Sequence, residues 1–360
     1  MQLRRLWLAL GLGAISVSML NAEKAKNVIL FLGDGTGLPT INASSIHAHG
    51  KPQALFVQRM PHSGLSDTST ASNWVTDSAA GMTAIVTGQK THNGVISQSA
   101  GAVRGKTDGA PLKTILEYAE EHGLATGVVS NSAITDATPA ACYAHGNDRD
   151  NWGAHFLQIL TPRFGDGVDV VIGPGRKKIM EQTAALEPDA AGKFKQRGYL
   201  FLDSPANLDA AGAGTKRLVA LFAGDEKEFD LEAATAKAVD ILSKNSKGFF
   251  LMVESNNHFE DAKRSLDNMA KFDRIIGQTA KRLEKSRTLI LFTADHSYDL
   301  HLPKGVDRGE DIVPAMKVEG HHNAEDVLVS AMGPGAEQVR GFFPNTRLFE
   351  IMLKAFGWKH

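Results

Sequence analysis

Ser78 lies in 74-WVTDSAAGMTAIVTG-88, where it follows Asp77 and precedes Ala-Ala-Gly, a run of very small side chains. An Asp-Ser pair ahead of such a run is typical of a helix N-cap, which is the simpler interpretation of this stretch taken alone. The unpaired backbone N–H groups of a helix N-terminus also attract anions, so a serine held there could act as a nucleophile toward a phosphoryl group. Other residues must decide between a cap and a nucleophile.

Acids and histidines follow several apolar runs of the chain. Asp34, Glu254 and the pair Asp295-His296 each end or follow such a run. Each taken alone has an ordinary structural explanation, such as a turn or a helix cap. Together they predict a shared site, because ligands bind outside the carboxyl ends of the strands in an open α/β sheet. Carboxylate oxygens and imidazoles suit Zn²⁺ and Mg²⁺.

A metal ion beside a serine makes a coherent reaction. The ion lowers the pKa of the hydroxyl, so that the oxygen attacks phosphorus without a histidine base. An arginine fork would hold two of the phosphoryl oxygens during that attack.

The elements that must position these residues alternate along the chain. Helix-like segments at 112–123, 231–245 and 265–285 separate short apolar runs, and residues 339–358 resemble a final helix. This alternation predicts an α/β fold with a largely parallel sheet covered by helices on both faces. Residues 175–230 have weak patterning and are expected to form a surface excursion. The six runs expected as strands are 27–33, 126–130, 168–173, 248–254, 288–294 and 327–333.

The first 22 residues have the layout of a secretory signal: two arginines, an apolar run and a small residue at Ala22. The alternative, a membrane span, needs a run of about 20 apolar residues, which is longer than this one. We therefore expect a signal peptide at 1–22, a single catalytic domain at 23–360, and a secreted or periplasmic protein that is not inserted in a membrane. Lys and Arg total 39 against 40 Asp and Glu, so charge does not favour nucleic-acid binding. Cys142 is the one cysteine, which excludes an internal disulfide.

Five segments resemble those of alkaline phosphatases, in the family's order. The segment 76-TDSAAGMTAIVTGQKTHNGVI-96 resembles the nucleophile segment, and 28-VILFLGDGTG-37 is similar to the segment that supplies a bridging aspartate. The others are 136-DATPAACYAH-145 with Arg149 beyond it, 294-ADH-296 and 321-HHNAEDV-327. The resemblance covers most of residues 27–335 and implies a three-layer α/β sandwich. It also implies hydrolysis of small phosphate monoesters to inorganic phosphate through a phosphoserine. Members of the family are often dimers, so a homodimer is one expectation.

Carried onto this chain, the resemblance makes Ser78 the nucleophile, Arg149 the phosphate clamp and Asp77 the residue that orients the arginine. It also implies two zinc ions and one magnesium ion. The ligands of the first zinc would be Asp34, Asp295 and His296, with Ser78 facing the ion. Those of the magnesium would be Asp34, Thr138 and Glu254, with Asp136 bonded to the ion's waters. The second zinc would use His322, with His321 as a neighbour.

One segment departs from the family pattern. The positions where the family has an aspartate and a histidine after Glu254 hold Phe259 and Lys263. A shortened loop instead places the family histidine on His258, within 254-ESNNHFED-261. Asn256 is then our expected stand-in for the aspartate, with Asn257, Glu260 and Asp261 as alternatives. Because an amide oxygen is a weaker zinc ligand than a carboxylate, we expect a looser, differently charged or metal-selective second site.

Three alternative functions remain open at this point. A phosphodiesterase of the same superfamily is disfavoured, because an arginine such as Arg149 grips the oxygens of a terminal phosphate. A sulfatase of this fold has x-Pro-x-Arg after its nucleophile, whereas Ser78 is followed by Ala-Ala-Gly-Met. A non-catalytic phosphate- or metal-binding protein is the third alternative.

Overall fold

The computed structural model describes residues 23–202, 208–223 and 229–359. The expected signal peptide, residues 1–22, lies outside the described residues. In the described ranges, the helices are all too short or too polar to cross a membrane.

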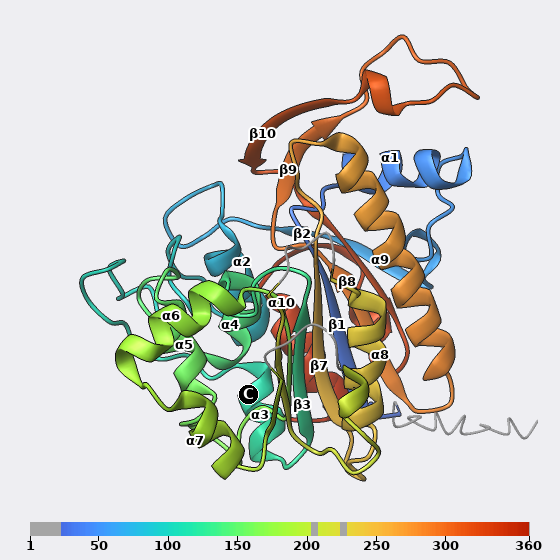
Figure 1. Ribbon diagram of the computed structural model, residues 1–360. Coiled ribbons are helices and arrows are strands. Elements are labelled where there is room, and N and C mark those ends of the chain that lie inside the picture. The colour runs from blue at the N-terminus through green and yellow to red at the C-terminus, as the bar shows by residue number, and fades with distance from the viewer. Residues whose placement is uncertain (1–22, 203–207, 224–228, 360) are drawn as a thin grey trace, which may run out of the picture.

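One large sheet forms the centre of the molecule (Figure 1). In the described part of the chain its ten strands follow the order β12-β2-β11-β8-β1-β7-β3-β4-β6-β5. Neighbouring strands pair in parallel except around β11, which is antiparallel to both β2 and β8. All six predicted strands are present, and the prediction of a largely parallel sheet is confirmed. The strands are β1 Asn27–Asp34, β2 His62–Asp67, β3 Ala125–Ser130, β4 Val170–Gly173, β5 Leu200–Leu202, β6 Leu218–Leu221, β7 Phe249–Asn256, β8 Thr288–Thr293, β11 Val327–Met332 and β12 Gly341–Pro344.

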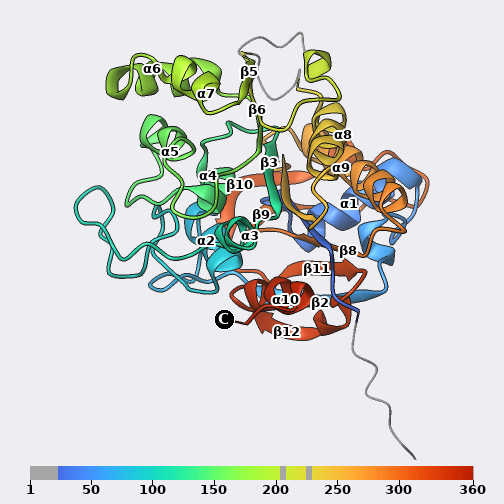
Figure 2. The same cartoon turned by 90° about the horizontal axis from the view of Figure 1, so that it is seen from below.

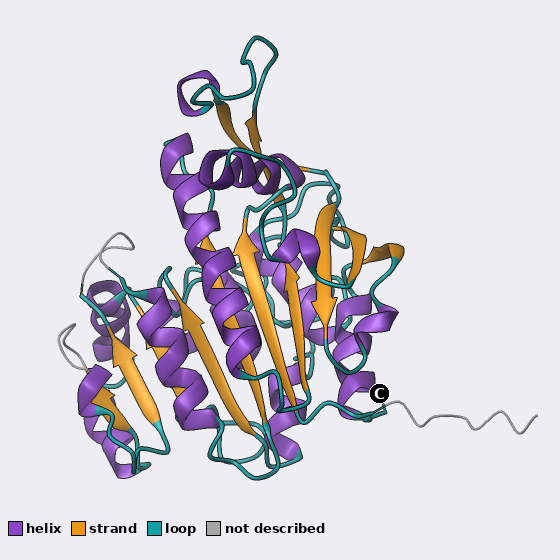
Figure 3. Cartoon of the chain, turned by 90° about the vertical axis from the view of Figure 1, so that its right-hand side faces the viewer, coloured by secondary structure: helices purple, strands orange, loops and turns teal. Residues whose placement is uncertain are grey.

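Helices cover both faces of this sheet, which gives the expected three layers (Figures 1 and 3). Alternate residues of β1 show how: Leu30 packs toward one group of helices, and Phe31 packs toward the other. The first group is α2 Ser78–Thr87, α3 Ile115–Glu121, α4 Ala137–Tyr143, α5 Trp152–Gln158, α6 Arg176–Leu186, α7 Ala190–Gln196 and α10 Arg347–Phe356. The second is α1 Leu38–His49, α8 Leu231–Leu242 and α9 Ala262–Arg282. Short 3-10 turns occur at Val57–Arg59, Leu208–Ala210, Val313–Ala315 and Ala336–Gln338.

Residues 175–230 differ from the expected surface excursion. They include α6, α7 and the two strands β5 and β6, which extend the sheet beyond β4 at one end of the molecule (Figure 2). The two strands have only three and four residues, so their apolar residues are too few to give a periodic signal.

A two-stranded antiparallel sheet, β9 Ser297–His301 and β10 Lys317–Asn323, rises beyond the carboxyl ends of the parallel strands (Figure 1). It packs against α1 and α9 through a small apolar cluster that contains Ala43, Leu266, Tyr298 and Leu300. Pairing of β9 with β10 returns the chain to the point where β9 begins, next to the end of β8.

Candidate active site

The carboxyl ends of three adjacent strands bring together the acids predicted to share a site. Strand β1 lies between β7 and β8 and is parallel to both, so Asp34, Glu254 and Asp295 reach the same edge of the sheet. All three carboxyl groups are buried, and so is His296. Burial of this many acids in one place is costly unless they are paired or bound to a cation.

Asp34, Asp295 and His296 form a cluster whose ligand atoms all lie within 4.8 Å of one another. The Nε2 atom of His296 is 3.2 Å from Asp34 Oδ1 and 3.5 Å from Asp295 Oδ2. The other oxygen of Asp295, Oδ1, accepts hydrogen bonds from the backbone N–H groups of Gly35 and His296. Asp34 Oδ1 and Asp295 Oδ2 are buried and have no hydrogen-bond partner. Two such oxygens beside an imidazole nitrogen fit a bound Zn²⁺ ion.

Burial and the neighbouring charges shift the pKa of all three residues of this cluster. Burial raises the pKa of Asp295 to about 6, helped by the charge of Asp34. Burial opposes ionisation of Asp34 too, but the nearby His258 and His296 outweigh it and lower the pKa of Asp34. Burial alone would lower the pKa of His296, yet the adjacent carboxylates of Asp295 and Asp34 raise it to about 9. The cluster is therefore a place where positive charge is stabilised.

Ser78 is the first residue of α2, and its hydroxyl faces this cluster. Asp77 is the N-cap: its Oδ1 accepts a 3.0 Å hydrogen bond from the backbone N–H of Ala80. Since Asp77 supplies the cap, the hydroxyl of Ser78 is not needed for it. The Oγ atom of Ser78 lies 3.4 Å from His296 Nε2. The stretch thus contains a cap and a separate hydroxyl at the helix N-terminus.

One of the small residues after Ser78, Gly81, is required by the packing of α2. Every residue of α2 is buried. A Cβ atom on Gly81 would lie 2.8 Å from the carbonyl oxygen of Asp295, closer than real Cβ contacts. Gly81 is therefore required for the close packing of α2 against the segment that carries Asp295 and His296.

Arg149 is held by two carboxylates, not by Asp77 alone. Its guanidinium donates a hydrogen bond of 3.1 Å to Asp77 Oδ2 and one of 2.9 Å to Asp136 Oδ1. Burial would lower the pKa of Arg149, but Asp136 and Asp77 outweigh it and raise the pKa above its ordinary value. Asp77 Oδ2 also accepts a hydrogen bond of 2.8 Å from the backbone N–H of Gly94. Sequence reasoning placed Asp136 near the magnesium and missed its direct hydrogen bond with Arg149.

Glu254 and Thr138, predicted as magnesium ligands, are both buried, in β7 and in the first turn of α4, and these two elements pack together. Burial raises the pKa of Glu254 well above its ordinary value, and the charge of Asp34 adds to this. Glu254 Oε2 accepts a hydrogen bond from Ser130 Oγ, a contact that sequence reasoning missed. Ser130 ends a predicted strand, β3, directly beside β7, so its place at a strand end was the available signal.

His258 and His322, the histidines expected at the second zinc site, lie beside Asp34 and His296. His258 Nδ1 is 3.4 Å from Asp34 Oδ1 and is buried without a hydrogen-bond partner. The His322 ring stacks on that of His296 at 3.6 Å between centroids and lies 5.8 Å from that of His258. Pairing of β9 with β10 places His322 opposite Tyr298, two residues beyond His296, while His321 is exposed. The three imidazoles therefore form one cluster beside Asp34, whose Oδ1 atom is approached by both His258 and His296.

The two acidic alternatives in this segment have different surroundings. Asp261 is the N-cap of α9, where its side chain accepts a hydrogen bond from the backbone N–H of Arg264, and Glu260 is exposed. The suggestion that either replaces the family aspartate stays a prediction. The side chain of Asn257 is buried and bonded to Thr36 and Ser255. Asn256 Oδ1 accepts a hydrogen bond of 3.2 Å from the backbone N–H of His258 and so orients the loop that carries this histidine.

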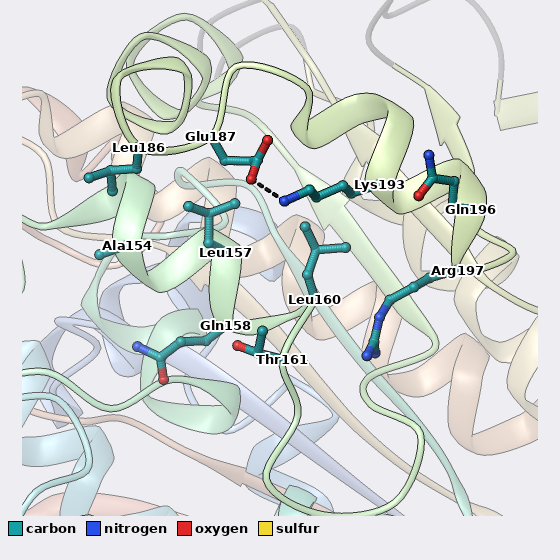
Figure 4. Close-up of a pocket in the computed structure, with 10 residues that line it drawn as sticks. All are labelled: Ala154, Leu157, Gln158, Leu160, Thr161, Leu186, Glu187, Lys193, Gln196 and Arg197. Carbon is teal, nitrogen blue, oxygen red and sulfur yellow. Dashed lines mark hydrogen bonds and ion pairs between the residues drawn. The ribbon is translucent and has the colours of Figure 1, made fainter.

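A separate cavity of about 600 Å³ lies between α5, α6 and α7, and none of the predicted site residues lines it (Figure 4). Its wall includes Gln158, whose amide bonds both the backbone N–H and the carbonyl of His145. This contact supports the start of the segment that leads to Arg149. Cys142 is a buried free thiol, as expected.

Comparisons with known proteins show which family this chain belongs to. The model of the family described as "Alkaline phosphatase" matches residues 25–319. An alkaline phosphatase of Gadus morhua is 28% identical, over 91% of this chain and 81% of its own length. Streptomycin-6-phosphate phosphatase of Streptomyces griseus is 29% identical, over 92% of this chain and 91% of its own length.

A solved structure shows the same fold. It is a mutant of the alkaline phosphatase of the Antarctic bacterium TAB5 with magnesium bound in its M3 site. It is 26% identical, with a TM-score of 0.76, and the match covers 94% of this chain and all of that one. The family model and these relatives span most of the described residues, and the chain therefore belongs to the alkaline phosphatase family of metal-binding phosphatases.

Proposed function

We propose that this phosphatase hydrolyses phosphate monoesters through a covalent phosphoserine at Ser78, with two zinc ions and one magnesium ion. The observation that carries the proposal is the position of the Ser78 hydroxyl. It lies at the N-terminus of α2, 3.4 Å from His296 Nε2, beside buried acids that have unpartnered oxygens. A helix N-terminus favours a phosphoryl anion at the same place.

The metal ligands follow from the three groups of donors. Asp34, Asp295 and His296 would hold one zinc, and His258 and His322 would hold the other, with Asn256 as the proposed third ligand. Glu254, Thr138 and Asp34 would hold magnesium, with Asp136 bonded to its waters. The ions would neutralise the phosphate and lower the pKa of the serine hydroxyl when bound.

The chain's own residues direct the phosphoryl transfer. Ser78 Oγ would attack phosphorus, and the leaving oxygen would depart on the opposite side, toward His258 and His322. The guanidinium of Arg149 has the geometry to hold two non-bridging oxygens of the phosphoryl group. Its hydrogen bonds to Asp77 and Asp136 fix its orientation. After the alcohol leaves, water can approach the phosphoserine from the vacated side. Two such in-line steps release inorganic phosphate and regenerate the hydroxyl.

Substrate preference tests this function directly. We expect a phosphate monoester to be hydrolysed much faster than a diester or a sulfate ester under the same conditions. Chelation should abolish the activity, and Zn²⁺ together with Mg²⁺ should restore it. A preference for the diester or the sulfate would favour another member of the superfamily. Phosphate binding without turnover, with all metals present, would mean a non-catalytic binding protein.

The second zinc site has a test that does not depend on activity. Zinc content per chain should fall in His322→Ala and His258→Ala, whereas the exposed neighbour offers a matched control, His321→Ala, that should keep full content. Equal zinc in all three variants would contradict the proposed ligands. The same measurement on Asn256→Ala tests the amide as third ligand.

Export and assembly are also part of the proposal. The pattern of residues 1–22 supports cleavage after Ala22 and a secreted or periplasmic enzyme. N-terminal sequencing of the protein from its native host tests this, since a chain that keeps residue 1 inside the cell would contradict it. A homodimer is proposed from the family alone, and light scattering of the mature chain would show its mass.

A further inference from the structure

Three exposed apolar side chains lie close in sequence to the proposed site residues. Among the described residues, six large apolar side chains are exposed, and three of them lie within four positions of Asp34 or Ser78: Leu38, Trp74 and Val75. Trp74 is the most exposed of all, at 83%. Tryptophan is enriched at binding interfaces, where its large aromatic face can contact a ligand.

The loop that carries Trp74 has a well-fixed backbone. Thr70 N–H bonds the carbonyl of Asn73, and the amide of Asn93 bonds the carbonyl of Val75. Asn93 Oδ1 also accepts a 2.9 Å hydrogen bond from the backbone N–H of Asp77. These bonds hold the chain on both sides of Trp74. Its exposure is therefore a consequence of a defined loop structure.

The same loop contacts His322, one of the two histidines toward which the leaving oxygen is proposed to depart. The ring of His322 donates a 3.0 Å hydrogen bond through Nδ1 to the carbonyl of Thr76. Trp74 is two residues away, which places its Cα within about 7 Å of that of Thr76, since an extended residue spans at most about 3.6 Å. A side chain as long as an indole can cover the remaining distance to the space above His322.

We propose that Trp74 is a specificity-determining residue that contacts the alcohol part of the substrate and favours aromatic alcohols. The inference rests on the proposed function, because it takes the leaving oxygen to depart toward His258 and His322. Arg149 and the helix N-terminus recognise only the phosphoryl group, which all monoesters share. The indole face offers an aryl leaving group a stacking partner just beyond that group.

The test compares an aryl and a polar alkyl monoester, 2-naphthyl phosphate and glycerol 2-phosphate. Loss of the stacking contact in Trp74→Ala should lower kcat/KM for the aryl ester about 5- to 10-fold, mainly through KM, with less than about 2-fold change for the glycerol ester. Trp74→Phe should recover most of the preference. Inhibition by inorganic phosphate, which has no alcohol, should be the same in all of these proteins.

Phe342 provides a matched control, since it is 78% exposed but lies in the edge strand β12. Phe342→Ala should leave the ratio of the two substrates unchanged. An unchanged ratio in Trp74→Ala, with the parent active on both esters, would overturn the role of Trp74 while leaving the proposed function intact. An equal loss of kcat/KM for both esters, together with weaker phosphate inhibition, would mean that Trp74 only supports the loop that carries Ser78. That result would also overturn the proposed role of Trp74 in specificity. A parent inactive on every monoester would instead refute the proposed function.

Discussion

Replacing Gly81 with alanine tests why the helix after Ser78 is built from small residues. Gly277, in the interior of α9, provides a matched comparison. A Cβ atom on Gly81 would lie 2.8 Å from the carbonyl oxygen of Asp295, whereas one on Gly277 would lie 3.4 Å from the ring of Phe56, an ordinary contact. Both changes are the same substitution in a helix, so both gain about 1 kcal/mol of helix propensity.

The difference between the two variants therefore isolates the clash. Overpacking against a fixed backbone atom costs about 1–3 kcal/mol, so Gly81→Ala should be less stable than Gly277→Ala by about that amount. This corresponds to a difference in Tm of roughly 1–4 °C for a chain of this size. Thermal unfolding with the same metal ions present measures it. Equal stability of the two variants would refute the packing explanation for Gly81.

Three further outcomes are expected. Arg149→Lys should lower kcat/KM about 10- to 100-fold and weaken phosphate inhibition in parallel, because a lysine keeps the charge but loses the fork; unchanged phosphate inhibition would contradict the clamp. Ser130→Ala should weaken Mg²⁺ binding about 10- to 100-fold, because Glu254 loses the hydroxyl that orients it; calorimetric titration with Mg²⁺ would detect this, and an unchanged Kd would exclude the role. Burial raises the pKa of Glu120 to about 7, although the hydrogen bond from Thr126 opposes this. Between pH 4.5, the ordinary pKa of glutamate, and pH 7, Glu120 is therefore protonated in the folded state and ionised in the unfolded state. Stability should then fall as pH rises from about 4.5 to 7, by up to about 3 kcal/mol, and Glu120→Gln should flatten this slope in urea unfolding; an equal slope would contradict the burial argument.

The strands and the main site residues could be predicted because their signals are local. A buried parallel strand is a short apolar run, and a functional acid at its end follows immediately, as Asp34 follows β1. Topology then guarantees that such ends meet, so Asp295 and His296 could be assigned to the same edge of the sheet without knowledge of any distance.

Other features depend on contacts between distant segments, which no local pattern reports. The bond from Arg149 to Asp136 depends on the orientation of α4 against the nucleophile helix. The requirement for Gly81 depends on how closely α2 approaches the end of β8. In residues 254–261, several polar side chains had suitable chemistry for a metal, and only the fold shows that Asp261 is committed to capping α9.

Direct observation of the covalent intermediate at Ser78 is the most decisive test of the proposed mechanism. The enzyme would be mixed with a phosphate monoester, quenched in acid during turnover, digested and analysed by mass spectrometry. We expect one phosphoryl group on the peptide that contains Ser78, and none in Ser78→Ala, which should also lose turnover. Phosphate on a different residue, or near-normal turnover by Ser78→Ala, would contradict it.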